Sequence, residues 1–435
     1  MCRNKSYSLS LRIIGGLLQV NSYPMHVNDV QSLVLNAIKP LEIVLIPFAE
    51  IAGYVLAEDI ESTEDIPLFN RSMMDGFAIR YEDVLQASVV APAHLNVIEE
   101  VAAGAVPLKT IGVGEAARIM TGAMIPPGAN AVCRFEATKD FFLTGVRSVG
   151  ILAPQLCGAN IALQGEDIPI GTVILKRGHR IGAAEIAVLA TFGKQLVPVF
   201  RKPKVGILSS GSELIEVDQP MTPGKIRNSN SYMVAALIQQ AGGLPIVLKP
   251  TADNEHALIA EINSILDKVD VLVTTGGVSV GDYDLIPAVF DKLGAVTHVS
   301  KVLMRPGSPF CFAIRNNIPL IGLSGNPAAA FVHTQLFVLP VIRQMSGVLT
   351  PEPRFTKALL TSSLPAKAPI KHTRFLRATA YLEEGLVKVA VATGQSSGMI
   401  GSFIGANCLV RLSGGLSPGP ESQVDILLYD EVKIR

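Results

Sequence analysis

An apolar run followed by a glycine-rich, acid-tipped turn is the feature of this sequence that most plainly suggests chemistry. Residues 271–275 are apolar or β-branched, and they lead into Gly-Gly-Val-Ser-Val-Gly-Asp-Tyr-Asp at residues 276–284. Glycines let backbone N–H groups approach an anion closely, and the start of a following helix would add a positive dipole. A carboxylate at the rim, such as Asp284, can hold the Mg²⁺ that accompanies phosphate. The sequence therefore predicts a phosphate cradle with a metal beside it.

Two other segments repeat this pattern of an apolar run and a glycine turn. Residues 205–214 read Val-Gly-Ile-Leu-Ser-Ser-Gly-Ser-Glu-Leu, and residues 319–327 read Pro-Leu-Ile-Gly-Leu-Ser-Gly-Asn-Pro before a long apolar helix. Three such turns within one stretch of chain suggest that they share one ligand site.

The elements around these turns alternate between strand and helix patterns. From about residue 201 to 347 we expect strands at 205–208, 246–248 and 271–275, and helices at 231–241, 256–266 and 286–293. Alternation at this spacing predicts a mostly parallel sheet flanked by helices. Ligands of such sheets bind outside the carboxyl ends of the strands, which is where all three glycine turns fall.

The rest of the chain divides into segments of different character, so the expected fold is a multi-domain α/β protein. The α/β domain is central, and it is joined by a β-rich inserted domain, a helical and extended linking domain and an all-β domain at the C-terminus. The linking domain is expected to hold a strand at 55–60 and a helix at 181–190. The predicted boundaries are 1–24 as an extension outside the fold, 25–66 plus 159–200 as the linking domain, 67–158 as the inserted domain, 201–350 as the α/β domain and 351–435 as the C-terminal domain.

Charge and composition exclude several classes of function. The 37 lysines and arginines balance 37 acids, so no global field attracts nucleic acid or an anionic membrane, and any anion must bind at a local site. No apolar run is long enough to span a bilayer. The five cysteines include no Cys-x-x-Cys pair, which favours a reducing cytoplasmic location with each thiol buried as a small apolar group.

The first 24 residues are basic and weakly resemble a targeting segment, but they lack a clear Ala-x-Ala cleavage site. Met25 stands just before a helical apolar pattern, and we expect the fold to begin there.

Seven strings along the chain, read together, identify a family resemblance. They lie at residues 67–79, 117–132, 165–168, 211–214, 276–281, 305–310 and 325–327. In this order and spacing they resemble the molybdopterin molybdenumtransferase family, whose eukaryotic relatives include the gephyrin E domain. The resemblance covers the chain from about Met25 to its end.

The resemblance implies an enzyme that takes adenylylated molybdopterin, inserts molybdenum from molybdate with Mg²⁺ present, and releases AMP. It also implies a homodimer, with the molybdopterin adenylyltransferase and molybdoenzyme chaperones as further partners. The metal ligands would be Glu213, Asp253 and Asp284.

The resemblance assigns further residues to the site. Those expected to act on the substrate from the inserted domain and its neighbour are Asp75, Thr121 and Asp167, which a dimer would bring to the α/β pocket of the other subunit. Those expected to bind the substrate are Gly276, Gly277, Ser279, Lys301, Arg305, Gly325, Asn326 and Pro327. Residues 396–398 are expected to close over the pocket from the C-terminal domain.

The chain departs from the family pattern at several positions, and the changes reduce positive charge around the pocket. Arg305 and Ser308 stand where the family commonly has lysines, and Ser324 replaces the proline of Pro-Gly-Asn-Pro. Residues 161–164 replace an arginine-rich lead into Gly-Glu-Asp. An arginine keeps the charge of a lysine but exchanges a point ammonium for a planar fork.

Each acidic assignment has a structural alternative. Glu213 could favour a helix N-terminus, and Asp253 could be the N-cap of the helix at 256–266. Asp75, Thr121 and Asp167 could be ordinary turn residues.

Three other functions stay open on the sequence. A molybdopterin adenylyltransferase resembles the α/β segment alone, and a scaffold of the gephyrin type would bind partner peptides. A non-catalytic paralogue that binds molybdopterin or molybdate without turnover would fit the lost basic residues.

Overall fold

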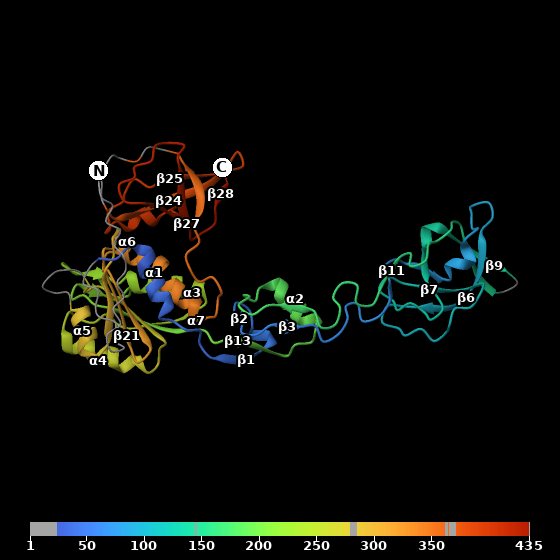
Figure 1. The fold of residues 1–435 in the computed structure, drawn as a ribbon, viewed down its shortest axis with the longest axis horizontal. Helices are drawn as coiled ribbons and strands as arrows, with labels where there is room; N and C mark the ends of the chain where they lie inside the picture. Colours follow the sequence, from blue (N-terminus) through green and yellow to red (C-terminus); the bar gives the residue numbers. More distant parts are fainter. Residues whose placement is uncertain (1–23, 144–145, 279–284, 362–363, 365–370, 435) are drawn as a thin grey trace, which may run out of the picture. The chain divides into compact units, whose positions relative to one another are not determined.

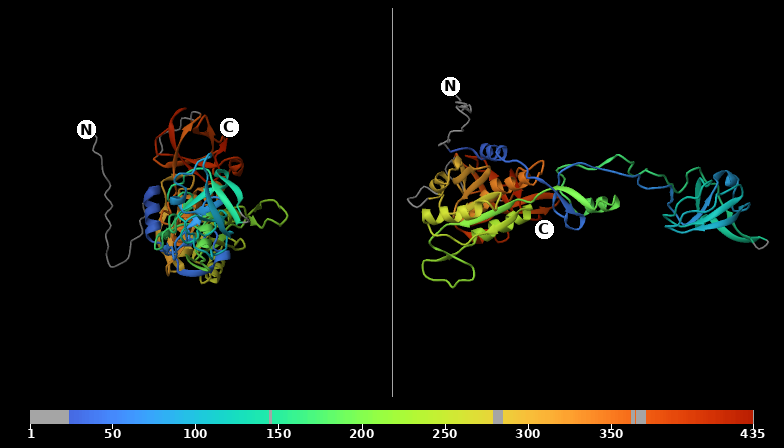
Figure 2. Two further views of the ribbon diagram at one scale, coloured as in Figure 1. Left: turned by 90° about the vertical axis from the view of Figure 1, so that its right-hand side faces the viewer. Right: turned by 90° about the horizontal axis from the view of Figure 1, so that it is seen from below.

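The computed structural model describes residues 24–143, 146–278, 285–361, 364 and 371–434 (Figures 1 and 2). The chain forms two compact units. Within the described residues, unit 1 comprises 24–57, 178–182 and 196–434, and unit 2 comprises 58–177 and 183–195. The finer division into five segments stays a prediction.

A six-stranded sheet forms the centre of unit 1, as the alternating pattern predicts. Its strands, in spatial order, are β17 (Leu244–Val247), β14 (Lys204–Ser209), β18 (Val271–Thr275), β22 (Ile318–Leu323), β21 (Pro309–Arg315) and β19 (Val296–Lys301). The first four are parallel, and the last two add to the sheet antiparallel. The prediction of a mostly parallel sheet flanked by helices is therefore confirmed.

Helices cover both faces of this sheet. One face packs against α1 (Val27–Asn36), α3 (Asn230–Ala241), α6 (Pro327–His333), a π-helix (Thr334–Val338) and α7 (Leu339–Met345). The other face packs against α4 (Glu255–Leu266) and α5 (Ile286–Lys292). Within β18, Val271 and Val273 enter the first core and Leu272 the second. Because both faces are buried, this strand reads as one continuous apolar run.

The C-terminal part of unit 1 is a β-sheet that shares a core with the α/β part. Its strands are β20 (Met304–Arg305), β23 (Thr356–Leu360), β24 (Thr373–Glu383), β25 (Leu386–Val391), β26 (Cys408–Leu412), β27 (Gln423–Leu428) and β28 (Lys433–Ile434), with a 3-10 helix at Ile400–Phe403. Phe375, Leu409 and Leu427 join the core beneath α3 and α6. β20 leaves the α/β part to pair with β24, so the two parts are joined by backbone as well as by packing.

A small sheet begins unit 1, and here one expectation was wrong. It consists of β1 (Ile43–Pro47), β13 (Leu196–Phe200) and β2 (Val55–Leu56), with a 3-10 helix at Phe48–Glu50. A single strand at 55–60 is not formed, because β2 ends at Leu56 and a separate strand, β3 (Ile60–Glu61), pairs within unit 2. The chain passes from one unit to the other between these two strands.

Unit 2 is β-rich with only one α-helix among its described residues, as expected for the inserted segment. Its six-stranded sheet contains β8 (Ala131–Arg134), β5 (Gly76–Ile79), β7 (Glu115–Ile119), β6 (Ala93–Val101), β10 (Val146–Ile151) and β9 (Thr138–Leu143). The remaining elements are β4 (Arg71–Ser72), β11 (Ile161–Ala162), β12 (Val173–Leu175), α2 (Ala183–Thr191) and 3-10 helices at Tyr81–Val84 and Phe135–Ala137. The helix expected at 181–190 is thus shifted by one or two residues.

Two expectations from composition can be compared with the described residues. No helix there combines the length and the apolar character needed to cross a membrane. Cys133, Cys311 and Cys408 are buried as expected, but Cys157 is exposed, which corrects that expectation for one thiol. Cys2 lies outside the described residues.

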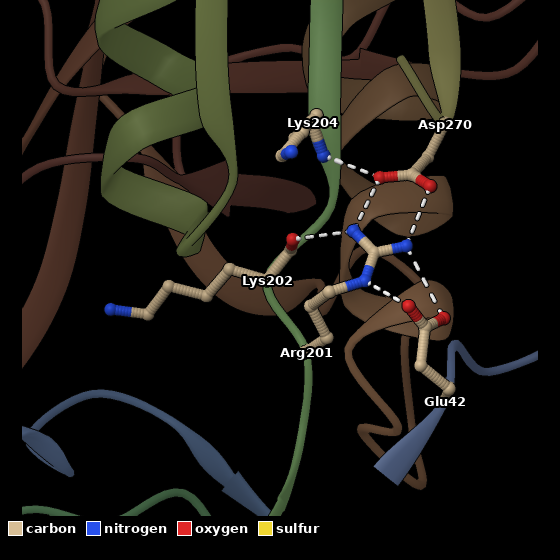
Figure 3. A network of polar contacts seen from close by, with 5 residues as sticks. All are labelled: Glu42, Arg201, Lys202, Lys204 and Asp270. Carbon is tan, nitrogen blue, oxygen red and sulfur yellow. Dashed lines mark hydrogen bonds and ion pairs between the residues drawn. The ribbon is translucent and has the colours of Figure 1, made fainter. Parts of the chain in front are cut away.

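Arg201 connects the small sheet to the central sheet at the point where β13 ends (Figure 3). Its guanidinium donates to both carboxylate oxygens of Asp270, each at 2.8 Å, and to the carboxylate of Glu42 just before β1. The backbone N–H of Lys204 also donates to Asp270, at 2.7 Å. Burial alone would raise the pKa of Asp270, but these hydrogen bonds outweigh it and hold the pKa below its usual range.

Removing the Asp270 charge should loosen this connection. Asp270→Asn leaves the partly buried Arg201 with one carboxylate instead of two, and we expect the local free energy of unfolding to fall by about 2 kcal/mol. Hydrogen exchange of the β14 and β18 amides measures this local free energy of unfolding. The control is Glu255→Gln, which removes an exposed ion pair with Lys292 and should cost less than about 1 kcal/mol. Equal effects in the two variants would contradict the proposed role of Arg201.

Candidate active site

A cavity of about 980 Å³ lies in unit 1 at the carboxyl ends of three neighbouring parallel strands. β14, β18 and β22 end at Ser209, Thr275 and Leu323, and the turn after each strand lines the cavity. The three glycine turns, which are separated by up to about a hundred residues of sequence, therefore meet in one place. This position outside the strand ends is where ligands of open α/β sheets bind.

Glycine is required where these turns touch one another. Gly276 has φ +96°, and a Cβ there would come within 2.4 Å of the carbonyl oxygen of Ser210. A Cβ on Gly325 would reach the Cα of Gly276 at 3.4 Å. A larger residue at Gly276 would push the first two turns apart, whereas at Gly325 a Cβ would only make ordinary van der Waals contact.

A buried polar network lies beneath the turns and fixes their spacing. The hydroxyl of Ser209 bonds to those of Thr275 and Ser231, at 2.7 and 2.6 Å, and to the side-chain oxygen of Asn228 at 3.0 Å. Asn230 donates its side-chain N–H to the carbonyl oxygen of Gly325 at 2.8 Å. The network links the ends of β14 and β18 and the first turn of α3 to the turn after β22.

Two of the three expected metal ligands line the cavity. Glu213 folds back over Gly211, and Asp253 accepts a hydrogen bond from the backbone N–H of Ser212 at 3.3 Å. Both structural alternatives fail. The N-cap of α4 is Asn254, whose side chain accepts from the N–H of Ala257, and Glu213 leads into the short strand β15 (Leu214–Ile215), which pairs with β16 (Ile226–Arg227).

These carboxylates suit a metal that is held partly by its substrate. Among the described residues no cluster of three or more His, Cys, Asp or Glu side chains could hold a metal ion by itself. Mg²⁺ commonly takes only one or two carboxylates, with water and substrate phosphates completing its shell. Glu213 and Asp253 beside the glycine turns meet that requirement.

One part of the cavity wall is cationic, because Arg227, Arg305 and Arg374 all belong to the lining. Arg305 of β20 and Arg374 of β24 are register partners and both line the cavity, and neither forms an ion pair in the described part of the chain. Arg374 is only 8% exposed. The pKa of nearby His372 lies below its ordinary value, first because the ring is partly buried and then because Arg305 and Lys301 are close. This wall offers unneutralised positive charge to an anion.

His333 of α6 holds the loop that carries Arg305. The ring is fully buried, and its Nε2 lies 2.6 Å from the carbonyl oxygen of Gly307, which lines the cavity. Burial lowers the pKa of His333 to about 4 despite the opposing effect of that hydrogen bond, so the ring is neutral near pH 7 and Nε2 must carry the proton it donates. At Gly307, with φ +93°, a Cβ would lie 2.3 Å from Nε2, so the contact requires glycine.

The C-terminal part of unit 1 closes one side of the cavity with a loop, as expected. Gln395, Ser397 and Gly398 line it, and the carbonyl oxygen of Ser397 accepts from the N–H of Ala328 at 3.0 Å. Ala328 lies in the first turn of α6, directly after Asn326 and Pro327. The loop is therefore attached to the same helix start that follows the third glycine turn.

The expected residues divide into four groups by position. Those that line the cavity are Glu213, Asp253, Gly276, Gly277, Arg305, Gly325, Asn326 and Pro327. Lys301 is exposed on β19 and is not part of the lining. Ser279 and Asp284 lie outside the described residues.

Asp75, Thr121 and Asp167 form the fourth group, in unit 2. Asp75 accepts hydrogen bonds from the backbone N–H and the hydroxyl of Thr121, at 2.6 and 2.7 Å. The N–H and then the hydroxyl of Thr121 hold the pKa of Asp75 below its usual range. Asp167 is exposed in the same unit. The first two residues thus form one exposed pair.

Many cavity residues were missed by the sequence reasoning, and the polar ones include Arg227, Asn228, Asn230, Arg374 and Gln395. Asn228 and Asn230 each keep one buried side-chain atom without a hydrogen-bond partner in the described chain, and both line the cavity with Arg374 and Gln395. The polar run Asn-Ser-Asn-Ser at 228–231, placed just before an apolar helix, was a usable signal. Nothing local distinguishes Arg374 from other arginines in strands.

Comparison with known protein families identifies the class of protein to which this fold and cavity belong. The MoeA N-terminal region (domains I and II) matches residues 25–193, a probable molybdopterin binding domain matches 206–344, and the MoeA C-terminal region (domain IV) matches 357–427. Most residues that line the cavity lie in the second of these matches, and the others, such as Arg374 and Gln395, lie in the third. The class is therefore that of molybdopterin-binding proteins with MoeA architecture.

Individual relatives narrow this to one family. A molybdopterin molybdenumtransferase of Bacillus subtilis is 43% identical over 378 residues, which are 86% of this chain and 87% of the relative. One from Staphylococcus aureus is 38% identical over 409 residues, with 94% and 96% covered. The chain belongs to the MoeA family of molybdopterin molybdenumtransferases, and the resemblance inferred from its motifs is confirmed.

A solved structure supports the same assignment. The molybdopterin biosynthesis MoeA protein of Pyrococcus horikoshii has 30% sequence identity and a TM-score of 0.81, and the match covers 94% of this chain and all of the other. A second structure of that protein has 31% identity and a TM-score of 0.78. The predicted multi-domain α/β fold is confirmed over nearly the whole chain.

The buried His333 should make stability depend on pH. Its pKa is about 4 in the folded chain against an ordinary value of 6.5, so between these values only the unfolded chain binds the proton. The free energy of unfolding of the α/β part should therefore fall by about 3 kcal/mol as pH drops from 6.5 to 4. His333→Gln keeps a donor for Gly307 and should flatten this dependence.

Denaturant unfolding at several pH values, followed by hydrogen exchange in α6, measures the effect. His256→Gln, at an exposed position of α4, is the control and should keep the wild-type slope. If His333→Gln retained that slope as well, the assigned protonation state of His333 would be wrong.

Proposed function

We propose that the cavity is the place where this enzyme binds adenylylated molybdopterin and molybdate, inserts molybdenum and releases AMP in a Mg²⁺-dependent reaction. The observation that carries the proposal is the combination within one cavity of three glycine turns, two carboxylates and three arginines, Arg227, Arg305 and Arg374, that form no ion pair among the described residues. A phosphoanhydride with Mg²⁺ and a second oxyanion require these three kinds of group.

The glycine turns are proposed to hold the phosphates. The turns at 276–277 and 325–327 approach each other closely, and α6 begins directly after the second. Backbone N–H groups that point into a small volume bind phosphate oxygens without requiring side-chain ordering. The substrate's phosphoanhydride would thus lie between the ends of β18 and β22, with its orientation fixed before the reaction.

Glu213 and Asp253, with Asp284 as the third expected ligand, are proposed to hold Mg²⁺ against those phosphates. When bound, the metal would neutralise charge that develops on the phosphate oxygens as the anhydride bond breaks. Glu213 and Asp253 reach the cavity from the ends of different strands, so their spacing is set by the sheet.

Arg305 and Arg374, assisted by Lys301 nearby, are proposed to attract molybdate. Arg374 is buried and should interact with an oxyanion more strongly than it would in water, because the local dielectric constant is low, whereas Arg305 is exposed. Their planar forks offer several N–H donors to a tetrahedral oxyanion. This arrangement offsets the lysines that the family commonly has at positions 305 and 308.

We further propose a homodimer, in which Asp75, Thr121 and Asp167 serve the cavity of the partner subunit. One face of the small sheet supports an interface, because Ile43, Leu45 and Leu196 are each about half exposed or more on neighbouring strands. An uncovered apolar face of this kind is typical of a subunit interface. A molybdopterin adenylyltransferase and molybdoenzyme chaperones are proposed as further partners, and a cytoplasmic location stays a prediction.

The decisive experiment is AMP release from adenylylated molybdopterin by the purified protein with Mg²⁺, in the presence and absence of molybdate. Molybdate-dependent release supports the proposal. Substrate binding without release would favour a non-catalytic paralogue, and ATP consumption in the absence of molybdate would favour an adenylyltransferase.

Glu213→Gln tests the metal assignment within that assay. Removal of one carboxylate from the cavity should raise the Mg²⁺ concentration for half-maximal AMP release by about tenfold or more. The control is Glu216→Gln, because Glu216 accepts a hydrogen bond from Tyr232 and does not line the cavity. An unchanged Mg²⁺ requirement in Glu213→Gln would remove Glu213 from the site.

Leu45→Lys tests the homodimer. Leu45 is 61% exposed on β1, and a charge there should raise the dimer dissociation constant by about tenfold or more. Sedimentation at micromolar concentration should show a dimer for the wild type and a shift toward monomer for the variant. Leu386→Lys, a change at a 49% exposed position of β25, is the control, and a monomeric wild type would contradict the proposal.

A further inference from the structure

Arg377 of β24 is a buried charge that no carboxylate neutralises. The side chain is 0% exposed, and it forms no ion pair among the described residues. Burial lowers its pKa, and only the Tyr429 hydroxyl acts weakly in the opposite direction. An unpaired buried charge is costly in a protein interior, and Nη1 of Arg377 has no hydrogen-bond partner among the described residues, so a specific use is expected for the donors that are bonded, Nε and Nη2.

The partnered donors of Arg377 all go to one segment, residues 394–402. Nη2 donates to the carbonyl oxygens of Gly394 and Ser396, each at 3.0 Å, and Nε donates to the hydroxyl of Ser402 at 2.6 Å. The backbone of Arg377 holds the same segment from the other side. Its N–H donates to Gln395 at 3.0 Å, and its carbonyl oxygen accepts from Gln395 at 2.9 Å.

The segment held in this way is the loop that closes the cavity. Its residues Gln395, Ser397 and Gly398 belong to the lining, and Ser397 accepts the hydrogen bond from Ala328. That bond places the loop against the start of α6, next to the glycine turn at 325–327 that was assigned above to the phosphates. The position of the loop therefore depends on Arg377 at one end and on α6 at the other.

We propose that Arg377 is a positioning residue that sets this loop against the phosphate-binding turn and thereby determines how tightly the enzyme holds adenylylated molybdopterin. The inference deepens the proposed function and depends on it for the identity of the substrate. Only a planar guanidinium can bond two carbonyl oxygens and a hydroxyl from one rigid group, whereas a lysine ammonium on a flexible chain cannot keep all three.

The test compares Arg377→Lys with Arg411→Lys, a matched change in the same sheet. Arg411 of β26 pairs with Asp425 and lies over the ring of Phe355, away from the cavity lining. In Arg377→Lys we expect the KM for adenylylated molybdopterin to rise about tenfold while kcat changes by less than about twofold, because contacts shared by ground and transition state are lost. Arg411→Lys should change neither.

A second readout does not depend on turnover. Hydrogen exchange at residues 394–398 should accelerate in Arg377→Lys by about tenfold or more, with the β26 and β27 amides unchanged. A lower kcat at unchanged KM would indicate loss of folded enzyme only and would overturn the proposal, as would unchanged exchange in the loop.

A further variant and a binding measurement test the role of Arg377 separately from the proposed catalytic function. If Arg377→Lys fails to fold, Ser402→Ala removes one acceptor only and should raise KM by about threefold. If the wild type binds adenylylated molybdopterin without releasing AMP, the proposed function fails. The role of Arg377 can then still be tested, because the dissociation constant for adenylylated molybdopterin should be about tenfold higher in Arg377→Lys than in the wild type. No binding difference between the wild type and Arg377→Lys would then reject the role of Arg377.

Discussion

The parallel pairing of β14, β18 and β22 is the constraint on which the rest of the structure depends. Parallel neighbours present their carboxyl ends at one edge, so three turns far apart in sequence must meet there. Parallel strands are also buried on both faces, which is why helices cover the sheet and why each strand is apolar throughout. The polar groups are consequently confined to the strand ends, where Ser209 and Thr275 can bond to each other and still face the cavity.

Two cavity loops, at Gly307 and at 394–398, do not follow the parallel strands directly. Buried polar side chains fix their positions instead. His333 fixes the Gly307 loop as a neutral donor, and Arg377 fixes the 394–398 loop as an unpaired cation. Both side chains donate to backbone carbonyl oxygens. These acceptors move only if the loop backbone itself moves. Each is costly to bury, and the cost is offset only while the loop keeps one conformation. The positions of the loops at the cavity rim are thus set by residues buried inside the α/β part and the C-terminal part of unit 1.

Particular residues show which parts of the fold and of the candidate site could be predicted from the sequence. The alternation of apolar runs and glycine turns predicted the parallel sheet and the meeting of Gly276 with Gly325, because both follow from local patterns and a topological rule. The break between β2 and β3 was missed because a change of unit leaves no signal in hydrophobic period. Arg374 and Arg377 were missed because their importance arises from pairing with β20 and from a loop about twenty residues later. Whether Asp75 and Thr121 serve the cavity is a question about a second subunit, which no local pattern addresses.

The C-terminal sheet helps to explain how a chain without net charge could hold the two anionic substrates proposed above. A strand edge with glycine turns supplies N–H groups and carboxylates, but its acids oppose a second oxyanion. Arg227 of β16 is one positive group of the lining, and two more come from the junction, where β20 leaves the α/β part and sets Arg305 beside Arg374 of β24. Neither arginine is neutralised by a nearby acid among the described residues, so their charge is available inside the cavity although the lysines and arginines of the whole chain balance its acids. The C-terminal sheet is therefore part of the proposed site, because its Arg374 is the buried member of a cationic lining that Arg227 and Arg305 of the α/β part complete.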